Sequence, residues 1–244
     1  TGSEVTPISI VTLPSNEKMG VVTPVILPDI ALLDPDLTHS LPAHTTAATG
    51  IDAMVHAIEA YASTSPNNNP ISRMLAVQAL TLMGRSLLTA VRNGTDADAR
   101  SDMLLGSMMA GQAFANSPVA AVHALAYPLG GHFHVPHGLS NALVLPYVLR
   151  FNVATQPQPY AALAPHLFPD LAAMAEEERA VAFCDRLAEL CRDCGLEPNL
   201  RALDIPESIL PQLAADAMKQ QRLLVNNPRA VSEADALEIY RAAL

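Results

Sequence analysis

The sequence contains no tryptophan, and aromatic residues make up only 4% of its 244 positions. Basic residues are also scarce, because 14 Lys and Arg stand against 24 Asp and Glu, for a formal net charge of -10. Binding to nucleic acids or anionic lipids depends on neutralising their phosphates, so this charge argues against nucleic acid and membrane partners. With 50% hydrophobic and 16% charged residues, the chain is not disordered and can bury a continuous core.

Cysteine is rare and confined to one stretch, which holds Cys184, Cys191 and Cys194. An odd number of closely spaced cysteines suits free thiols better than a disulfide framework, and we therefore expect a cytoplasmic protein. The spacing Cys191-x-x-Cys194 also occurs in redox and zinc motifs. No second cysteine pair accompanies it, so a structural role is predicted.

Targeting and membrane segments are not expected. The first six residues include no initiating Met, no basic segment and no apolar segment, so the chain is expected to start inside a longer protein. The longest nearly apolar stretch, 118–131, is shorter than the roughly 18 residues that a membrane-spanning helix needs.

The chain divides into two patterns. β-Branched runs at 8–12, 21–23 and 25–27 predict three short strands, whereas the residues after position 42 have helical spacing and are rich in Ala, Leu and Met. We expect helices at 45–63, 70–92, 97–116, 118–128, 138–152, 171–194, 207–220 and 232–243. The predicted fold is mainly α, with a bundle-like helical domain at 42–244 preceded by a few short strands within 1–41.

The predicted strands pose a physical problem, because a small isolated sheet is marginal in water and its unpaired edges invite association. We therefore expect them to complete the sheet of an adjoining α/β domain whose other strands lie outside this sequence.

One candidate for chemistry is the pair Asp52 and His56. Four residues apart on a helix, they differ by about 40° around its axis and share one face. Both side chains can reach one divalent ion, although an acid beside an ordinary core histidine gives the same spacing. Glu59 lies on the same face and is predicted to be solvated or to support a ligand.

A second candidate is the segment 122–138, which holds four of the eight histidines: His123, His132, His134 and His137. Pro128 and the two glycines after it are expected to break the helix, so that His123 and His137 approach from the two sides of the break. The histidines of the turn are expected to face solvent or substrate.

Together the two clusters provide three imidazoles and one carboxylate, from Asp52, His56, His123 and His137. This donor set suits Fe(II) or Zn(II) and would leave a coordination position open. Spacing alone does not decide between this metal site and histidines without a ligand.

The motifs, taken in order, resemble those of the iron-containing alcohol dehydrogenases, the metal-dependent group III family. They are Thr-Gly-Ser-Glu-Val-Thr at 1–6, Asp-Pro-Asp-Leu-Thr at 34–38, Ala-Thr-Gly-Ile-Asp-Ala-Met-Val-His-Ala-Ile-Glu at 48–59, and His123 through Pro-His-Gly at 136–138. The resemblance spans essentially the whole chain. It implies that the sequence is the C-terminal helical domain of such an enzyme, without its N-terminal nucleotide-binding domain.

The resemblance also implies an activity, the interconversion of a small alcohol with an aldehyde or ketone by a homodimer that uses NAD or NADP. It makes Asp52, His56, His123 and His137 the metal ligands and places Thr1, Gly2 and Ser3 in the cofactor loop, with Lys18 a weaker candidate. The Gly-Gly-Gly-Ser phosphate turn of many relatives does not occur in the sequence. The chain alone is therefore expected to be inactive.

One departure from the family concerns the proton relay. Many members have histidine where this chain has Tyr127, and a phenol with a pKa near 10 is a poor proton shuttle at neutral pH. Three alternatives are open. The metal environment could lower the pKa of Tyr127, His132 or His134 could replace it as the relay, or the relay could run through water and cofactor hydroxyls. Tyr127 and His132 are the catalytic candidates.

Two other functions remain open. A metal-free reductase of the maleylacetate type is one, although such relatives tend to have Asn at the position of Asp52. The other is a helical metal-binding module without turnover.

Overall fold

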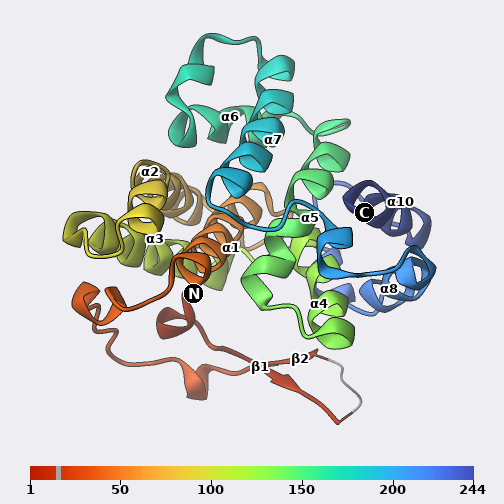
Figure 1. Ribbon diagram of the computed structural model, residues 1–244, viewed down its shortest axis with the longest axis horizontal. Coiled ribbons are helices and arrows are strands. Elements are labelled where there is room, and N and C mark those ends of the chain that lie inside the picture. The colour runs from red at the N-terminus through yellow and green to blue at the C-terminus, as the bar shows by residue number, and fades with distance from the viewer. Residues whose placement is uncertain (15–17) are drawn as a thin grey trace.

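The computed structural model describes residues 1–14 and 18–244, with the backbone alone at Thr12 and Lys18 (Figure 1). The chain is mainly helical, as predicted. Its α-helices are α1 (Ala43–Ala62), α2 (Pro70–Arg92), α3 (Ala97–Asn116), α4 (Ala121–Phe133), α5 (His137–Val153), α6 (Gln158–Leu167), α7 (Glu176–Asp193), α8 (Leu210–Ala217), α9 (Gln221–Leu224) and α10 (Glu233–Ala243). Short 3-10 turns lie at Ser3–Val5, Pro24–Ile26, Pro35–Thr38, Pro169–Ala173, Leu200–Leu203 and Glu207–Ile209.

The described strands form one antiparallel pair beside the helical domain (Figure 1). Strand β1 (Ile8–Thr12) pairs with β2 (Lys18–Val22), and Ile8 lies opposite Val22. The predicted strand at 25–27 is wrong. Residues Pro24–Ile26 form a 3-10 turn because Pro24 cannot donate to a strand ladder, and the Thr23 hydroxyl caps the turn by accepting from the backbone N–H of Val25.

Helix α1 forms the centre of the helical domain. It contacts α2, α3 and α5, and every residue from Ile51 to Ala60 is buried. A helix that is covered on all sides must bury its polar residues too, so Asp52, His56 and Glu59 all lie in the interior. This is the structural basis of the site described below.

The turn that joins α4 and α5 differs from the prediction. Helix α4 continues through Pro128 to Phe133, so the expected break at Pro128 is wrong. The chain leaves the helix at His134, which adopts a left-handed conformation with φ 55°. Val135 follows. Because proline disfavours the helical conformation in the residue before it, α5 begins only after Pro136.

Helix α2 is long and apolar enough to cross a membrane, judged by length and composition alone. In the structure it packs against α1 and α3, and a core helix of a globular domain meets the same criterion. One such helix is therefore weak evidence for a membrane span.

The cysteines are buried free thiols. Burial raises the pKa of both Cys184 and Cys191 to about 12 and that of Cys194 to about 11. Because the reactive form of cysteine is the thiolate, the predicted structural role of these residues is supported.

Candidate metal centre

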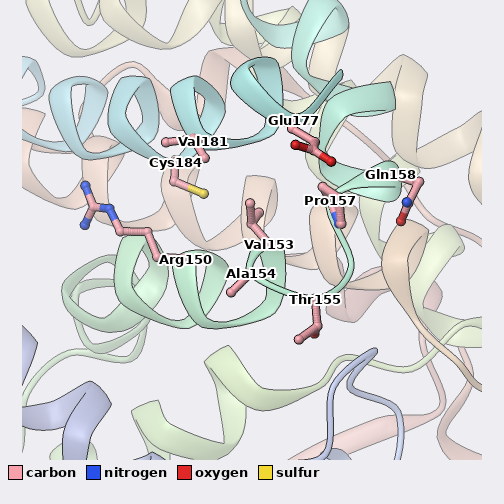
Figure 2. Close-up of a pocket in the computed structure, with 9 residues that line it drawn as sticks. All are labelled: Arg150, Val153, Ala154, Thr155, Pro157, Gln158, Glu177, Val181 and Cys184. Atoms are coloured by element: carbon pink, nitrogen blue, oxygen red, sulfur yellow. The ribbon is translucent and has the colours of Figure 1, made fainter. Parts of the chain in front are cut away.

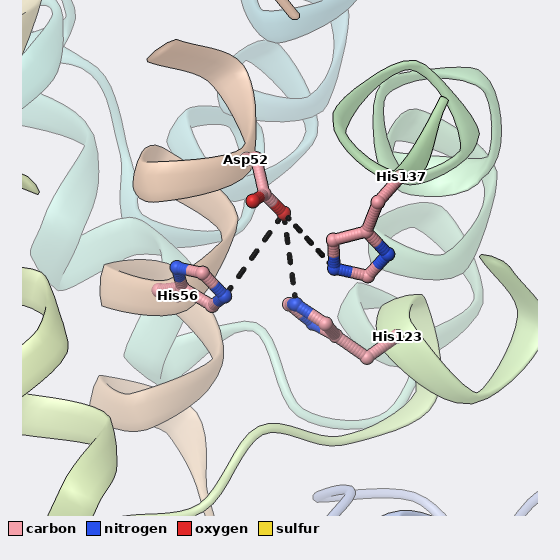
Figure 3. A group of neighbouring side chains, drawn as sticks. All are labelled: Asp52, His56, His123 and His137. Carbon is pink, nitrogen blue, oxygen red and sulfur yellow. Dashed lines mark ion pairs between the residues drawn. The ribbon is translucent and has the colours of Figure 1, made fainter. Parts of the chain in front are cut away.

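Four side chains from three helices converge on one point (Figure 3), three of them buried and the fourth, His137, exposed. Asp52 and His56 come from α1, His123 from the first turn of α4 and His137 from the first residue of α5. One donor atom from each of them lies within 4.8 Å of the others. The Asp52 Oδ1 atom is 4.0 Å from the Nε2 of His56, 3.7 Å from that of His123 and 3.6 Å from that of His137.

A close backbone approach brings His137 to this point. A Cβ atom on Gly138 would lie 2.3 Å from the carbonyl oxygen of Ala48 in α1, which is too close for any other residue without movement of the backbone. Glycine therefore allows the start of α5 to pack directly on α1. The side chain before it, His137, then reaches Asp52.

Glu59 supports the cluster from inside the protein, so the prediction of a solvated position is wrong and that of a supporting group holds. It is only 5% exposed, and its Oε2 lies 2.7 Å from the Nδ1 of His123. Its carboxylate also accepts the backbone N–H groups of Ala120 (3.0 Å) and Val122 (2.7 Å). A carboxylate that accepts from Nδ1 leaves the Nε2 lone pair of His123 directed at the cluster.

The electrostatics favour the protonation states that bind a cation. Burial lowers the pKa of His56 to about 3, against the opposing effect of Asp52, so this imidazole is neutral at physiological pH. Burial raises the pKa of Asp52, but the three histidines and the Thr1 hydroxyl together hold it below its ordinary value. The cluster therefore presents a carboxylate beside a neutral imidazole, the forms that metals bind.

Two further residues hold the Asp52 carboxylate. The Thr1 hydroxyl donates to its Oδ2, and the side-chain amide of Asn141 on α5 donates to its Oδ1 at 2.5 Å. Asn141 was missed in the sequence analysis. The available signal was its position, because it lies four residues after His137 and therefore on the same face of a helix.

The other residues predicted for the cofactor loop lie close to the cluster or outside the described atoms. Gly2 has φ 71° and packs so tightly that a Cβ on it would lie 2.7 Å from the Cα of Gly111. Ser3 is exposed at the mouth of the cavity beside the cluster. Lys18 lies in β2, and its side chain is outside the described part of the structure.

A cavity of about 300 Å³ opens beside the four side chains. Its walls include Phe114, Tyr127 and Arg222, together with the start of β1. The Phe114 ring lies 4.4 Å from that of His56, centroid to centroid. Burial raises the pKa of Tyr127, partly offset by Arg222, so its phenol stays protonated at neutral pH.

His132 does not belong to this site. Its Nε2 is 2.7 Å from Asp216 Oδ2 at the surface, and it is not among the residues that line the cavity. His134 is exposed in the turn after α4. The structure therefore brings His123 and His137 together and leaves the two histidines between them outside, as far as the described residues show.

A larger cavity, about 560 Å³, lies where the end of α5 meets α6 and α7 (Figure 2). Of its two charged residues, Arg150 and Glu177, Arg150 pairs with Asp185 at 2.7 Å, and burial strongly raises the pKa of its thiol, Cys184. Within the described residues, no group of three or more His, Cys, Asp or Glu that could hold a metal gathers there. Size alone does not make this cavity the reactive one.

The donor chemistry of the four converging residues fits a divalent transition metal. Nitrogen and carboxylate oxygen are ligands of both iron(II) and zinc(II). In a four-coordinate zinc site with bonds of about 2.0–2.2 Å, donor atoms are about 3.3–3.6 Å apart, only slightly closer than the distances from Asp52 Oδ1 found here. The fold and site together define the class: a helical domain with a candidate three-histidine, one-aspartate metal centre.

Comparison with known proteins places this chain within a family. The sequence model described as "Fe-containing alcohol dehydrogenase family, C-terminal" matches residues 46–244. The chain therefore belongs to the iron-containing alcohol dehydrogenase family, in agreement with the resemblance of its motifs.

Individual relatives agree with this assignment. Long-chain-alcohol dehydrogenase 1 of Geobacillus thermodenitrificans (strain NG80-2) is 46% identical over 243 residues, which cover 100% of this chain and 61% of that protein. NAD-dependent methanol dehydrogenase of Bacillus methanolicus is 32% identical, with coverage of 100% and 64%. A solved alcohol dehydrogenase from Oenococcus oeni, 33% identical, matches with a TM-score of 0.95 and coverage of 100% and 63%. The chain thus spans less than two thirds of the length of these relatives.

Proposed function

We propose that this chain is the metal-binding part of an NAD(P)-dependent alcohol dehydrogenase that interconverts a small alcohol with an aldehyde or ketone. The observation that carries the proposal is the convergence of Asp52, His56, His123 and His137 beside a cavity. Family membership and the name of the methanol dehydrogenase relative support alcohol as substrate and NAD as cofactor.

The four converging side chains would hold Fe(II) or Zn(II). A bound ion of this kind acts as a Lewis acid on the oxygen of the alcohol or carbonyl group. Glu59 orients His123, and Phe114 and Tyr127 cover the neighbouring wall of the cavity. Restricting water and fixing the substrate's position are the chain's own contributions to rate.

Tyr127 is the proposed proton-relay residue of this chain. It lines the cavity, and its ring lies 5.9 Å from that of His137. Its raised pKa means that the phenol takes part as a hydrogen-bond donor and acceptor within a chain of hydroxyl groups, not as a group that ionises near neutral pH. His132, which pairs with Asp216, is assigned no catalytic role.

The segment before α1 is proposed to belong to the nucleotide-binding domain, with the helical domain beginning at residue 42. Apolar side chains are exposed along it, including Val25 (88%), Ile30 (84%) and Leu32 (89%). Soluble domains rarely leave so many apolar groups together in water unless another surface covers them. A domain packed there would carry the phosphate-binding turn. The cytoplasmic location and the homodimer remain predictions.

Metal analysis of the purified chain tests this proposal. We expect about one divalent ion per chain after loading and dialysis, and loss of the ion in Asp52→Ala with helicity preserved. A metal-free reductase would contain no bound ion, and an Asp52→Ala variant that retains iron or zinc as tightly as its parent would exclude this ligand set. The chain alone is expected to reduce no nicotinamide cofactor, whereas clear turnover would show that it needs no second domain.

A further inference from the structure

Asn141 lies among the four converging side chains of the candidate metal centre, although it is not one of them. It is completely buried. Its Nδ2 atom lies 2.5 Å from Asp52 Oδ1, 3.4 Å from His123 Nε2 and 3.3 Å from His137 Nε2. One amide nitrogen therefore faces three of the four atoms that would bind the ion.

Two of these atoms, Asp52 Oδ1 and His123 Nε2, belong to buried side chains and need a hydrogen-bond donor or a cation beside them. Glu59 accepts a hydrogen bond from the Nδ1–H of His123, so the Nε2 of that ring presents a lone pair. Asp52 adds a carboxylate, whose other oxygen, Oδ2, already accepts from Thr1. Lone pairs crowded into a buried site repel one another and lose their hydration, and the Nδ2 protons of Asn141 relieve both costs.

The orientation of the Asn141 amide is set by its contact with Asp52. The Oδ1 atom of Asn141 is buried and has no hydrogen-bond partner among the described residues. Turning the amide over would place this oxygen against Asp52 Oδ1, where two acceptors would repel. The side chain leaves its own oxygen unpaired and keeps its nitrogen on the carboxylate, so the contact with Asp52 dominates.

A neutral donor suits such a place better than a charged one. Lysine would compete with a bound cation, and a second carboxylate would repel Asp52. Asparagine donates without adding charge. Asn141 reaches the site because it lies on the same helix as His137, about one turn further along α5.

We propose that Asn141 is a positioning residue of the metal centre. Its amide gathers Asp52, His123 and His137 around one point in the ion-free chain and keeps the Asp52 carboxylate in its binding orientation. The ion-affinity part of this inference rests on the proposed function, whereas the hydrogen bond to Asp52 does not.

The first test compares ion affinity in Asn141→Ala, Asn141→Leu and the parent, by competition for Zn²⁺ or Co²⁺ with a chromophoric chelator. Loss of a residue that orients a ligand typically lowers affinity about 10–100-fold, and we expect that loss here. The visible spectrum of bound Co²⁺ should also change, because a released carboxylate alters the coordination geometry. Affinity within about threefold of the parent with an unchanged spectrum would overturn the proposal.

Asn152→Ala is the matched control. Asn152 is a buried asparagine of the same helix, and it bonds to Tyr160 and Asn227, away from the centre. Its replacement should cost stability but leave ion affinity and the Co²⁺ spectrum unchanged. If this control weakens ion binding as much as the Asn141 variants do, the effect is general destabilisation and the proposal fails.

A second measurement uses the unmutated chain and needs no ion affinity. In the presence of a chelator, the side-chain amide protons of Asn141 should exchange with water far more slowly in NMR than those of exposed Asn67. Exchange as fast as that of Asn67 would overturn the proposed hydrogen bond, even if the Asn141 variants failed to fold. A protected amide in a chain that binds no ion would support the bond to Asp52 and reject the proposed function.

Discussion

The Nδ1 atom of His123 lies 2.7 Å from the Oε2 atom of Glu59, and both side chains are almost completely buried. Glu59 also accepts two backbone N–H groups at the start of α4, where Ala120 provides no side-chain cap. One carboxylate from α1 therefore satisfies a helix terminus and orients a candidate ligand. Any replacement of Glu59 should therefore affect both the orientation of His123 and the start of α4.

Glu59→Gln should consequently weaken both functions. The amide group of Gln would direct N–H donors at the backbone donors of α4, so we expect the free energy of unfolding to fall by about 1–3 kcal/mol. Affinity for Zn²⁺ should fall about 10–100-fold. Chemical denaturation and chelator competition measure the two effects. Glu197→Gln, at a surface carboxylate that pairs with His44, is the control and should change neither quantity appreciably.

The stability of the ion-free chain should depend on pH through His56. Its pKa falls from 6.5 to about 3 on folding, so between these values the unfolded chain binds the extra proton. Stability is then fully present above about pH 6.5 and is lost as pH falls toward 3. Asp52 acts in the same direction below its ordinary pKa of 3.8, because its pKa is also lowered in the folded chain.

Thermal unfolding in a chelator, followed by circular dichroism from about pH 7.5 to 4.5, checks this dependence. The midpoint should fall with pH, by about 2–4 °C for each kcal/mol lost. His56→Gln should make the fall shallower, whereas His166→Gln, at an exposed histidine of α6, is the matched control and should not. A His56→Gln profile as steep as that of the parent would show that His56 does not control the response.

Gly138→Ala should damage the centre without touching a ligand. The new methyl group would meet the backbone of Ala48, so α5 must move away from α1 and carry His137 with it. Overpacking of this kind costs about 1–3 kcal/mol, and ion affinity should fall as well. In Gly84→Ala, the added methyl would chiefly meet the flexible end of Leu167; ion binding should stay normal there. Equal ion affinity in both variants would contradict the role of the close approach.

Local signals predicted the middle helices well. The bounds of α2 and α3 match the expected 70–92 and 97–116, because Asn69 and Asp96 act as N-caps that the sequence reveals directly. Proline was harder to interpret. Helix α6, which contains Pro159 and Pro165, was not predicted; Pro159 lies in its first turn, where the missing N–H costs nothing.

In the site, too, features that depend on neighbouring residues could be predicted, and features that depend on distant contacts could not. The helical spacing of Asp52 and His56 placed them on one face, and the structure brings both to the cluster. Glu59 and Asn141 were misjudged or missed because their roles depend on partners that are 64 and 89 residues away. Hydrophobic periodicity says which face of a helix is buried, but it does not say which polar groups meet there.

Tyr127→His should leave the centre intact and change the proton relay. Tyr127 lines the cavity without being one of the four converging residues, so Zn²⁺ affinity should stay within about threefold of the parent. Burial keeps the native phenol protonated by raising its pKa, whereas an imidazole titrates near 6.5 when unperturbed. When the chain is joined to a nucleotide-binding domain, the pH profile of kcat should therefore gain an inflection near neutrality. Tyr127→Phe, which removes only the hydroxyl, should lower kcat without creating that inflection. Identical profiles in the parent and both variants would show that the relay does not pass through this position.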